Sequence, residues 1–194
     1  MKFYIFLFVQ IFFVLAVTAQ VKVNITWTEQ TKMKPSETIY YTSNKKLIWA
    51  DFIGKPPAPS STQAVTSSGF GYSADMKSTN GKGVINIRVY CFFNKIKSWV
   101  RASGKTNYIL EHEQHHFDAT YITAYDFVEK LKAANITTEN MDSLLGSIYK
   151  EANAARVKMQ NDYDTQTKNG ILRDKQVNWN QFFVEKLAEL SSIK

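Results

Sequence analysis

The chain has 194 residues, a formal net charge of +7 and a single cysteine, Cys91. One cysteine excludes an intramolecular disulfide, so packing, helped by any bound metal, has to stabilise the fold. The lysines are scattered along the chain instead of being concentrated with aromatic residues, and this pattern argues against a nucleic-acid-binding protein. We therefore expect no nucleic-acid partner.

The first 19 residues have the pattern of a secretory signal peptide. Lys2 precedes an apolar run over residues 3–17, and Val17-Thr18-Ala19 matches a cleavage site before Gln20. The run is too short for a permanent transmembrane span, and no second long apolar stretch follows it. We expect residues 1–19 to be removed and residues 20–194 to form one domain. The mature protein is then exported, to the periplasm or the extracellular space, without stable membrane insertion.

The first part of the mature chain has the short β-prone runs of a sheet. Strands are predicted at residues 38–41 and 47–49, and the polar residues 43–46 between them favour a turn. Three prolines within residues 56–59 fix φ and remove backbone donors. An extended loop is expected there.

Two longer strands are predicted further along the chain. Small, polar and aromatic residues alternate over residues 63–75, and residues 83–93 form the clearest β-prone run. Residues 79–83 between them contain the glycines and the asparagine that a hairpin turn requires. We expect the two strands to pair antiparallel.

The second half of the chain has helical periodicity. A first helix is predicted over roughly residues 107–134, with Thr106 or Asn107 as its cap. A second begins after Thr138 and continues towards Met159, and a third covers about 174–190. The apolar stripe of the first helix consists of Leu110, Phe117, Tyr121, Ala124, Val128 and Leu131. The fold class is therefore α+β, with an antiparallel sheet in the N-terminal half packed on three C-terminal helices.

The predicted first helix carries the motif His112-Glu113-x-x-His116. Residues four apart lie on the same face of a helix, so the two imidazoles can bind one metal ion. Catalytic zinc sites have three protein ligands and a water whose pKa the metal lowers to about 7. Glu113 can take the proton of that water and deliver it to a leaving amine. We predict Zn²⁺ as the cofactor, His112 and His116 as metal ligands, and Glu113 as the catalytic base.

The sequence leaves the third metal ligand open. Patterns that extend the motif place a further histidine after a glycine, and neither residue stands at the corresponding positions here. If the second helix packs antiparallel to the first, the acidic residues within reach are Glu151, Asp162 and Asp164. Each of them can equally be a solvated surface charge. The third ligand is one of these residues or is absent.

His115 lies outside the predicted ligand pair. It points about 100° from His116 on a helical wheel, so we expect it to face solvent or a polar neighbour. Asp118 lies further round the helix. Two roles are open to it, a hydrogen bond near the metal ligands or a solvated surface charge.

Several short motifs occur in a fixed order over about residues 38–190. The most specific is Leu110-x-His112-Glu113-Gln114-x-His116-Phe117-Asp118. The others are Leu47-x-Trp49-x-Asp51-Phe52-x-Gly54 with Pro56, Ser98-Trp99-Val100, Gln160-x-x-Tyr163-Asp164-x-x-Thr167 and Gln176-x-x-Trp179. Together they resemble the bacterial DUF922 family of predicted secreted zinc-dependent proteases. The resemblance implies a zincin-like metallopeptidase domain, zinc ligands His112 and His116, and a catalytic Glu113.

Two positions depart from the pattern of that family. Gln166 stands where the family usually has glutamate, and Asn169 stands where it usually has histidine. Unlike histidine, asparagine is a poor zinc ligand. These departures bear on catalysis more than on fold, and they leave two interpretations.

The first interpretation is a secreted zinc-dependent endopeptidase acting on a peptide or protein substrate. Its substrate pairs as a strand with a sheet edge, for which residues 84–93 are a candidate unless they are buried between neighbouring strands. The alternative is an exported non-catalytic metal-binding or protein-binding module derived from such a peptidase. The sequence does not identify the substrate or the oligomeric state.

Overall fold

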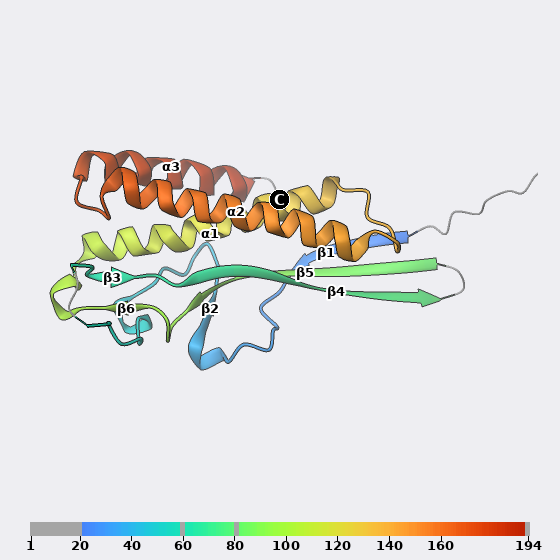
Figure 1. Ribbon diagram of the computed structural model, residues 1–194, viewed down its shortest axis with the longest axis horizontal. Coiled ribbons are helices and arrows are strands. Elements are labelled where there is room, and N and C mark those ends of the chain that lie inside the picture. Colours follow the sequence, from blue (N-terminus) through green and yellow to red (C-terminus); the bar gives the residue numbers. More distant parts are fainter. Residues whose placement is uncertain (1–20, 59–60, 80–81, 193–194) are drawn as a thin grey trace, which may run out of the picture.

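The computed structural model describes residues 21–58, 61–79 and 82–192. Within these ranges the chain forms a mainly antiparallel sheet followed by three helices, which confirms the predicted α+β class. The helices lie together on one face of the strands (Figure 1). The predicted signal peptide, residues 1–19, and the centre of the predicted hairpin turn, residues 80–81, lie outside the described residues.

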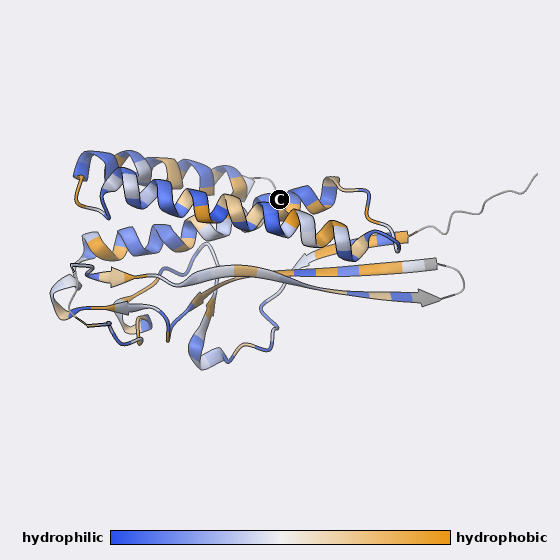
Figure 2. Cartoon of the chain, in the orientation of Figure 1, coloured by the Kyte–Doolittle hydropathy of each residue, from blue (hydrophilic) through white to orange (hydrophobic). Residues whose placement is uncertain are grey.

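The large sheet is organised around β5 (Lys82–Asn94). On one side β5 pairs antiparallel with β4 (Ser68–Thr79), as predicted. On the other side it pairs in parallel with β1 (Val21–Trp27) and antiparallel with β2 (Thr38–Tyr40). Hydrophobic and polar residues alternate along β5 (Figure 2), and its buried hydrophobic residues are Ile85, Ile87, Val89, Cys91 and Phe93. Residues 84–93 are therefore buried between neighbouring strands and cannot serve as the substrate edge.

Residues 47–49 do not form the predicted strand. The chain runs instead into a short 3₁₀ helix over Trp49–Asp51. The N–H of Leu47 donates to the side-chain oxygen of Gln114 at 2.8 Å, and the Leu47 side chain is buried. The hydrophobic character of the run reflects the burial of Leu47 in the core. The backbone N–H of Leu47 is bonded to a side chain of the first helix and not to a neighbouring strand.

The predicted strand at residues 63–75 is divided into two. β3 (Ala64–Val65) pairs antiparallel with β6 (Trp99–Val100) in a separate small sheet, and β4 follows after a break. At the break, the N–H of Ser67 donates to the hydroxyl of Ser98 at 2.9 Å. The break separates β3 from the large sheet, and β3 lies beside the first helix.

The three predicted helices are present, with different ends for the second. They are α1 (Asn107–Ala133), α2 (Met141–Thr167) and α3 (Arg173–Ser192). The hydroxyl of Thr106 accepts the N–H of Ile109 at 3.2 Å and so caps α1. Because α2 continues well past Met159, its last turns lie beside residues 112–120 of α1.

The helix α1 lies between the sheet and the other two helices. One hydrophobic cluster joins the sheet to α1 and the first half of α2. A second cluster joins α1 to the end of α2 and to α3, and consists of Ala119, Ile122, Tyr163, Phe183 and Leu190. Residues 112–120 of α1 are all buried as a result. The metal motif therefore lies in a covered part of α1, within the first ten residues of the helix.

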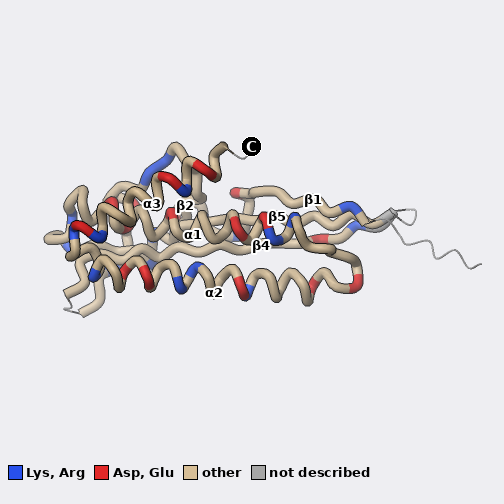
Figure 3. Tube along the Cα trace, turned by 90° about the horizontal axis from the view of Figure 1, so that it is seen from above, with Lys and Arg blue, Asp and Glu red and all other residues tan. Residues whose placement is uncertain are grey.

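The outer helices carry the charged surface. Basic and acidic residues are interspersed along α2 and α3 (Figure 3). Among the described residues, no helix is both long enough and apolar enough to cross a lipid bilayer.

Candidate metal centre

His112 and His116 lie on one face of α1, as their spacing predicts. Their ring centroids are 4.9 Å apart, and the residues are only 5% and 8% exposed. The ring of His112 stacks on Tyr163 of α2, with 4.5 Å between centroids. Packing by α2 thus fixes both imidazoles at the inner end of a cleft.

Asp164 of α2 is the acidic residue that meets both histidines. Its Oδ1 atom lies 3.2 Å from His112 Nε2 and 3.0 Å from His116 Nε2. The ligand atoms of the three residues all lie within 4.8 Å of one another, so His112, His116 and Asp164 can hold one metal ion. The other two candidates pair elsewhere, Glu151 with Lys130 and Asp162 with Lys158.

Contacts within this group shift the pKa values of Asp164 and His116. Burial favours the neutral carboxyl of Asp164, but hydrogen bonds from the two histidines outweigh it and hold its pKa well below the ordinary 3.8. Burial likewise favours neutral His116, but its hydrogen bond to Asp164 and the charge of Glu113 raise its pKa above the ordinary 6.5. Asp164 is therefore ionised at neutral pH, as a metal ligand must be.

Glu113 is a buried carboxylate at the same site. It is 4% exposed, and its Oε2 atom has no hydrogen-bond partner among the residues that the structure describes. The residue is held through its backbone, because the Thr66 hydroxyl donates to the Glu113 carbonyl at 3.0 Å. A buried charge without a partner is costly, so this side chain is more typical of a functional group than of a structural one.

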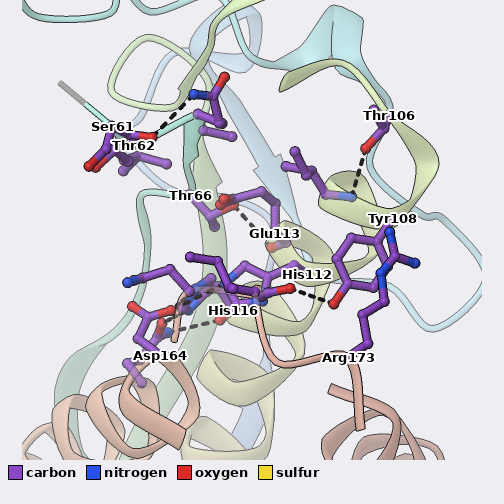
Figure 4. A pocket seen from close by; sticks show the side chains of 18 residues that line it. Ser61, Thr62, Thr66, Thr106, Tyr108, His112, Glu113, His116, Asp164 and Arg173 are labelled. Carbon is purple, nitrogen blue, oxygen red and sulfur yellow. Dashed lines mark hydrogen bonds and ion pairs between the residues drawn. The ribbon is translucent and has the colours of Figure 1, made fainter. Parts of the chain in front are cut away.

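The histidines, Glu113 and Asp164 line one cleft of about 680 Å³. In Figure 4 the two histidines and Asp164 lie together, with Glu113 beside them. The walls come from the segments 61–66, 106–116, 160–164 and 169–173. Its volume is in the range of small-molecule and peptide binding sites.

The strand β3 forms one wall of the cleft, and its edge opposite β6 has no strand partner in the described part of the chain. The N–H of Arg101 donates to the carbonyl of Gln63 at 2.8 Å, so these two residues form a hydrogen-bonded pair of the β3–β6 ladder. Backbone groups alternate in direction along an antiparallel strand, so Ala64 turns its N–H and C=O away from β6. Ala64 also lines the cleft, and β6 is the only strand partner of β3 in the described part of the chain.

No known family model, curated protein or solved structure matches the chain. The candidate site is therefore described from its own geometry. Two helices supply the three ligand atoms, and α1 also supplies the carboxylate of Glu113.

The two positions that depart from the DUF922 pattern have different surroundings. Gln166 accepts a hydrogen bond from the indole N–H of Trp179 at 3.1 Å and does not line the cleft. Asn169 does line the cleft, in a left-handed conformation with φ 53°, and its N–H donates to the Asp164 carbonyl at 2.8 Å. Asp164 meets both imidazoles, so the three-residue group does not require a histidine at position 169.

His115 and Asp118 form a buried network on another side of α1. His115 is 7% exposed and stacks on Phe183, so it does not face solvent. Its Nδ1 atom lies 3.0 Å from Asp118, which also accepts hydrogen bonds from the Tyr41 hydroxyl and the Gln114 amide at 2.9 Å each. The polar-neighbour expectation for His115 is confirmed, and the surface-charge role of Asp118 is wrong.

Sequence reasoning missed two glutamines that contact the histidines. Gln176 Oε1 lies 2.9 Å from His112 Nδ1, and Gln160 Oε1 is hydrogen-bonded to His116 Nδ1. In the sequence, both residues belong to the ordered motifs, which assign them no contact with a histidine. Gln176 was the easier one to find, because it lies only two residues into the third predicted helix, close to the turn that follows Asp164.

Proposed function

We propose that the protein is an exported zinc-dependent endopeptidase of the zincin type. In this proposal His112, His116 and Asp164 hold the metal, and Glu113 is the general base. The observation that carries it is the buried Oε2 of Glu113, which has no described partner and lies in the same cleft as the three-residue group. The similarity of the motif order to the DUF922 family supports the same conclusion, as does the signal-peptide pattern of residues 1–19 for export.

The donor set supports zinc as the metal. Catalytic zinc sites use three protein ligands, for example three imidazoles or two imidazoles and one carboxylate, so that one position stays open. Two imidazole nitrogens and one carboxylate oxygen converge here. Calcium and magnesium prefer sites made of oxygen atoms alone, so this donor set disfavours them.

The chain's own groups can carry the proton transfers of peptide hydrolysis. When bound, zinc would polarise the scissile carbonyl and lower the pKa of a water molecule in the cleft to about 7. Glu113 then accepts a proton from this water and passes it to the leaving amine.

The edge of β3 opposite β6 supports an extended peptide as the substrate. The backbone N–H and C=O of Ala64 point away from β6, and Ala64 lines the cleft. An extended peptide can add to such an edge through main-chain hydrogen bonds, which do not depend on side-chain identity. Its scissile bond would then lie between β3 and the His112–His116 face of α1.

A non-catalytic metal-binding module is the second candidate function. Gln166 and Asn169, which replace the glutamate and histidine of the DUF922 pattern, favour it. Such a module would keep the ligands His112, His116 and Asp164 and lack turnover. Metal binding alone does not separate the two candidates, so cleavage has to be measured.

The deciding comparison is Glu113→Gln against Glu111→Gln. Both residues lie on α1, but Glu111 is exposed and does not line the cleft. With purified protein, zinc and an unfolded protein substrate, we expect Glu113→Gln to lower kcat/KM by about 10²–10⁴-fold while zinc binding persists. Glu111→Gln should change neither quantity.

Two results would count against the proposal, the first against peptidase activity and the second against the role of Glu113. Zinc-loaded wild-type protein that cleaves none of a panel of unfolded proteins supports the non-catalytic module. Cleavage that survives Glu113→Gln shows that another group is the base.

A further inference from the structure

Both histidines of the site contact a glutamine on the side away from Asp164. Their Nε2 atoms face Asp164, at 3.2 Å for His112 and 3.0 Å for His116. The Nδ1 atom of His112 lies 2.9 Å from Oε1 of Gln176 on α3, and that of His116 is hydrogen-bonded to Oε1 of Gln160 on α2. Each imidazole is therefore held at both nitrogens by groups from other helices.

The orientation of the Gln160 amide follows from its other contacts. Its Nε2 donates to the carbonyl of His116 at 2.9 Å and to the hydroxyl of Thr120 at 3.0 Å. A carbonyl oxygen can only accept, so the nitrogen of the amide has to face it and the oxygen has to face His116 Nδ1. Because the amide oxygen also only accepts, His116 carries a proton on Nδ1.

The Gln176 amide is oriented in the same way. Its Nε2 donates to Oδ1 of Asn180 at 2.6 Å and to the hydroxyl of Tyr163. The Tyr163 hydroxyl in turn donates to the carbonyl of His112 at 3.4 Å. Gln176 is 1% exposed, so this orientation is held inside the protein. His112 therefore also carries a proton on Nδ1.

We propose that Gln160 and Gln176 are positioning residues that hold the Nδ1–H of His116 and His112, so that each ring binds one shared divalent cation through the Nε2 atom that faces Asp164. This inference rests on the metal site of the proposed function. Zinc-ligating histidines usually donate their second N–H to an outer partner, which fixes the tautomer and the ring orientation.

The neutrality of the two amides has a consequence for charge. Asp164 and Glu113 already bring two carboxylates into the cleft, and one divalent cation balances them. Carboxylates in place of the two glutamines would add negative charge and raise the basicity of the imidazoles. Amides give the same tautomer and orientation without that charge.

The test replaces each glutamine by methionine, which keeps the length of the side chain and removes the acceptor. Affinities for zinc and cobalt ions are measured by competition with a chelator, and circular dichroism verifies folding. We expect Gln160→Met and Gln176→Met each to lower the affinity for both metal ions by about 10–100-fold. The matched control is Gln181→Met, because Gln181 is exposed on α3 and its amide bonds only to Glu185 among the described contacts.

A rescue variant separates the acceptor role from packing. Gln176→Glu keeps an oxygen for the His112 Nδ1–H. Its second oxygen can accept from the Tyr163 hydroxyl and, once the Asn180 amide has turned over, from the Asn180 amide nitrogen. We expect this variant to regain the affinity that Gln176→Met loses. Should Gln176→Met not fold, Gln160→Met carries the test, because Gln160 is only half-buried.

A spectroscopic readout tests the tautomers directly. In zinc-loaded protein with ¹⁵N-labelled histidine, we expect two exchange-protected Nδ1–H signals for His112 and His116. Each methionine variant should lose the protection of its own histidine only. Nε2–H signals in the wild type, or methionine variants with unchanged metal affinity, would overturn the inference.

The outcomes distinguish this inference from the proposed function. Wild-type protein that binds zinc with protected Nδ1–H signals but cleaves no substrate disproves the peptidase and supports the positioning role. Wild-type protein that binds neither zinc nor cobalt overturns both.

Discussion

At the scale of single residues, Asp164 makes the difference between two neighbouring imidazoles and a group that can hold a metal. Its Oδ1 atom lies within 3.2 Å of both Nε2 atoms. The hydrogen bonds from the histidines keep its pKa below the ordinary range, so the ligand is charged at neutral pH. Asp162, two residues away on α2, pairs with Lys158 on the surface instead.

The contribution of Asp164 can be measured with a matched pair of substitutions. Asp164→Asn removes the charged ligand atom while nearly preserving volume, and Asp162→Asn makes the same change outside the site. We expect Asp164→Asn to weaken zinc binding by more than the roughly 100-fold that loss of an outer hydrogen-bond partner costs. Asp162→Asn should leave the dissociation constant, measured by chelator competition, within error of wild type. Equal affinities for the two variants would remove Asp164 from the ligand set.

The sequence could predict His112, Glu113 and His116 because their spacing within one helix determines their geometry. It could not choose among the acidic residues of the second helix. That choice depends on how α2 is shifted and rotated against α1, which is a property of tertiary packing. The two glutamines were missed for the same reason, because a polar residue on an amphipathic helix is normally solvated.

At the scale of elements, the turn between α2 and α3 shapes the floor of the site. Lys168, Asn169 and Gly170 all have positive φ, with 79° for the glycine. The Tyr108 hydroxyl donates to the Gly170 carbonyl at 2.5 Å, so the turn is tied to the first turn of α1. A Cβ atom at Gly170 would lie 3.4 Å from His112 Nδ1. A side chain at position 170 would therefore contact the His112 ring.

Substitution of two glycines by alanine should have opposite effects on stability. Gly170→Ala forces a left-handed conformation on a residue with a Cβ, so we expect the free energy of unfolding to fall by about 1–3 kcal/mol. Gly146 lies on the exposed face of α2, where an added Cβ meets no described atom within 4 Å. Gly146→Ala should raise the free energy of unfolding by roughly 0.5–1 kcal/mol, because alanine favours the helix. Urea unfolding measures both, and a stable Gly170→Ala variant would contradict the structural role of the turn.

The helices were predicted more accurately than the strands. A helix makes its hydrogen bonds within one segment, so its residues carry the pattern themselves. A strand needs a partner, and the sequence does not say which run finds one. Residues 47–49 lack a strand partner because α1 supplies the acceptor for Leu47, whereas β1 was not predicted and pairs in parallel with the distant β5.

At the scale of the whole molecule, a metal bound at the site would connect α1 to α2 directly and to α3 through Gln176. Binding to the folded state alone stabilises it, by about 2.7 kcal/mol when free zinc is 100 times its Kd. For a chain of this size we expect the Tm to rise by roughly 5–11 °C with zinc and to return with a chelator. An unchanged Tm under saturating zinc would contradict binding to the folded state.

The zinc effect should also depend on pH in a defined direction. Without metal, the raised pKa of His116 stabilises the folded state fully below pH 6.5, and this contribution is lost as pH rises through the folded pKa. The lowered pKa of Asp164 contributes above pH 3.8 and is lost as pH falls towards its folded value. Zinc has to displace the His116 proton, so we expect a larger zinc-induced rise in Tm at about pH 8 than at about pH 6. Calorimetry at both pH values checks the sign.

The most direct test of the account is anomalous diffraction at the zinc absorption edge from crystals grown with zinc. We expect one peak about 2.0–2.2 Å from His112 Nε2, His116 Nε2 and an Asp164 oxygen, with the Glu113 carboxylate beside it but not bound. A zinc peak that omits Asp164 or lies outside this cleft, or no peak in crystals grown with excess zinc, would contradict it.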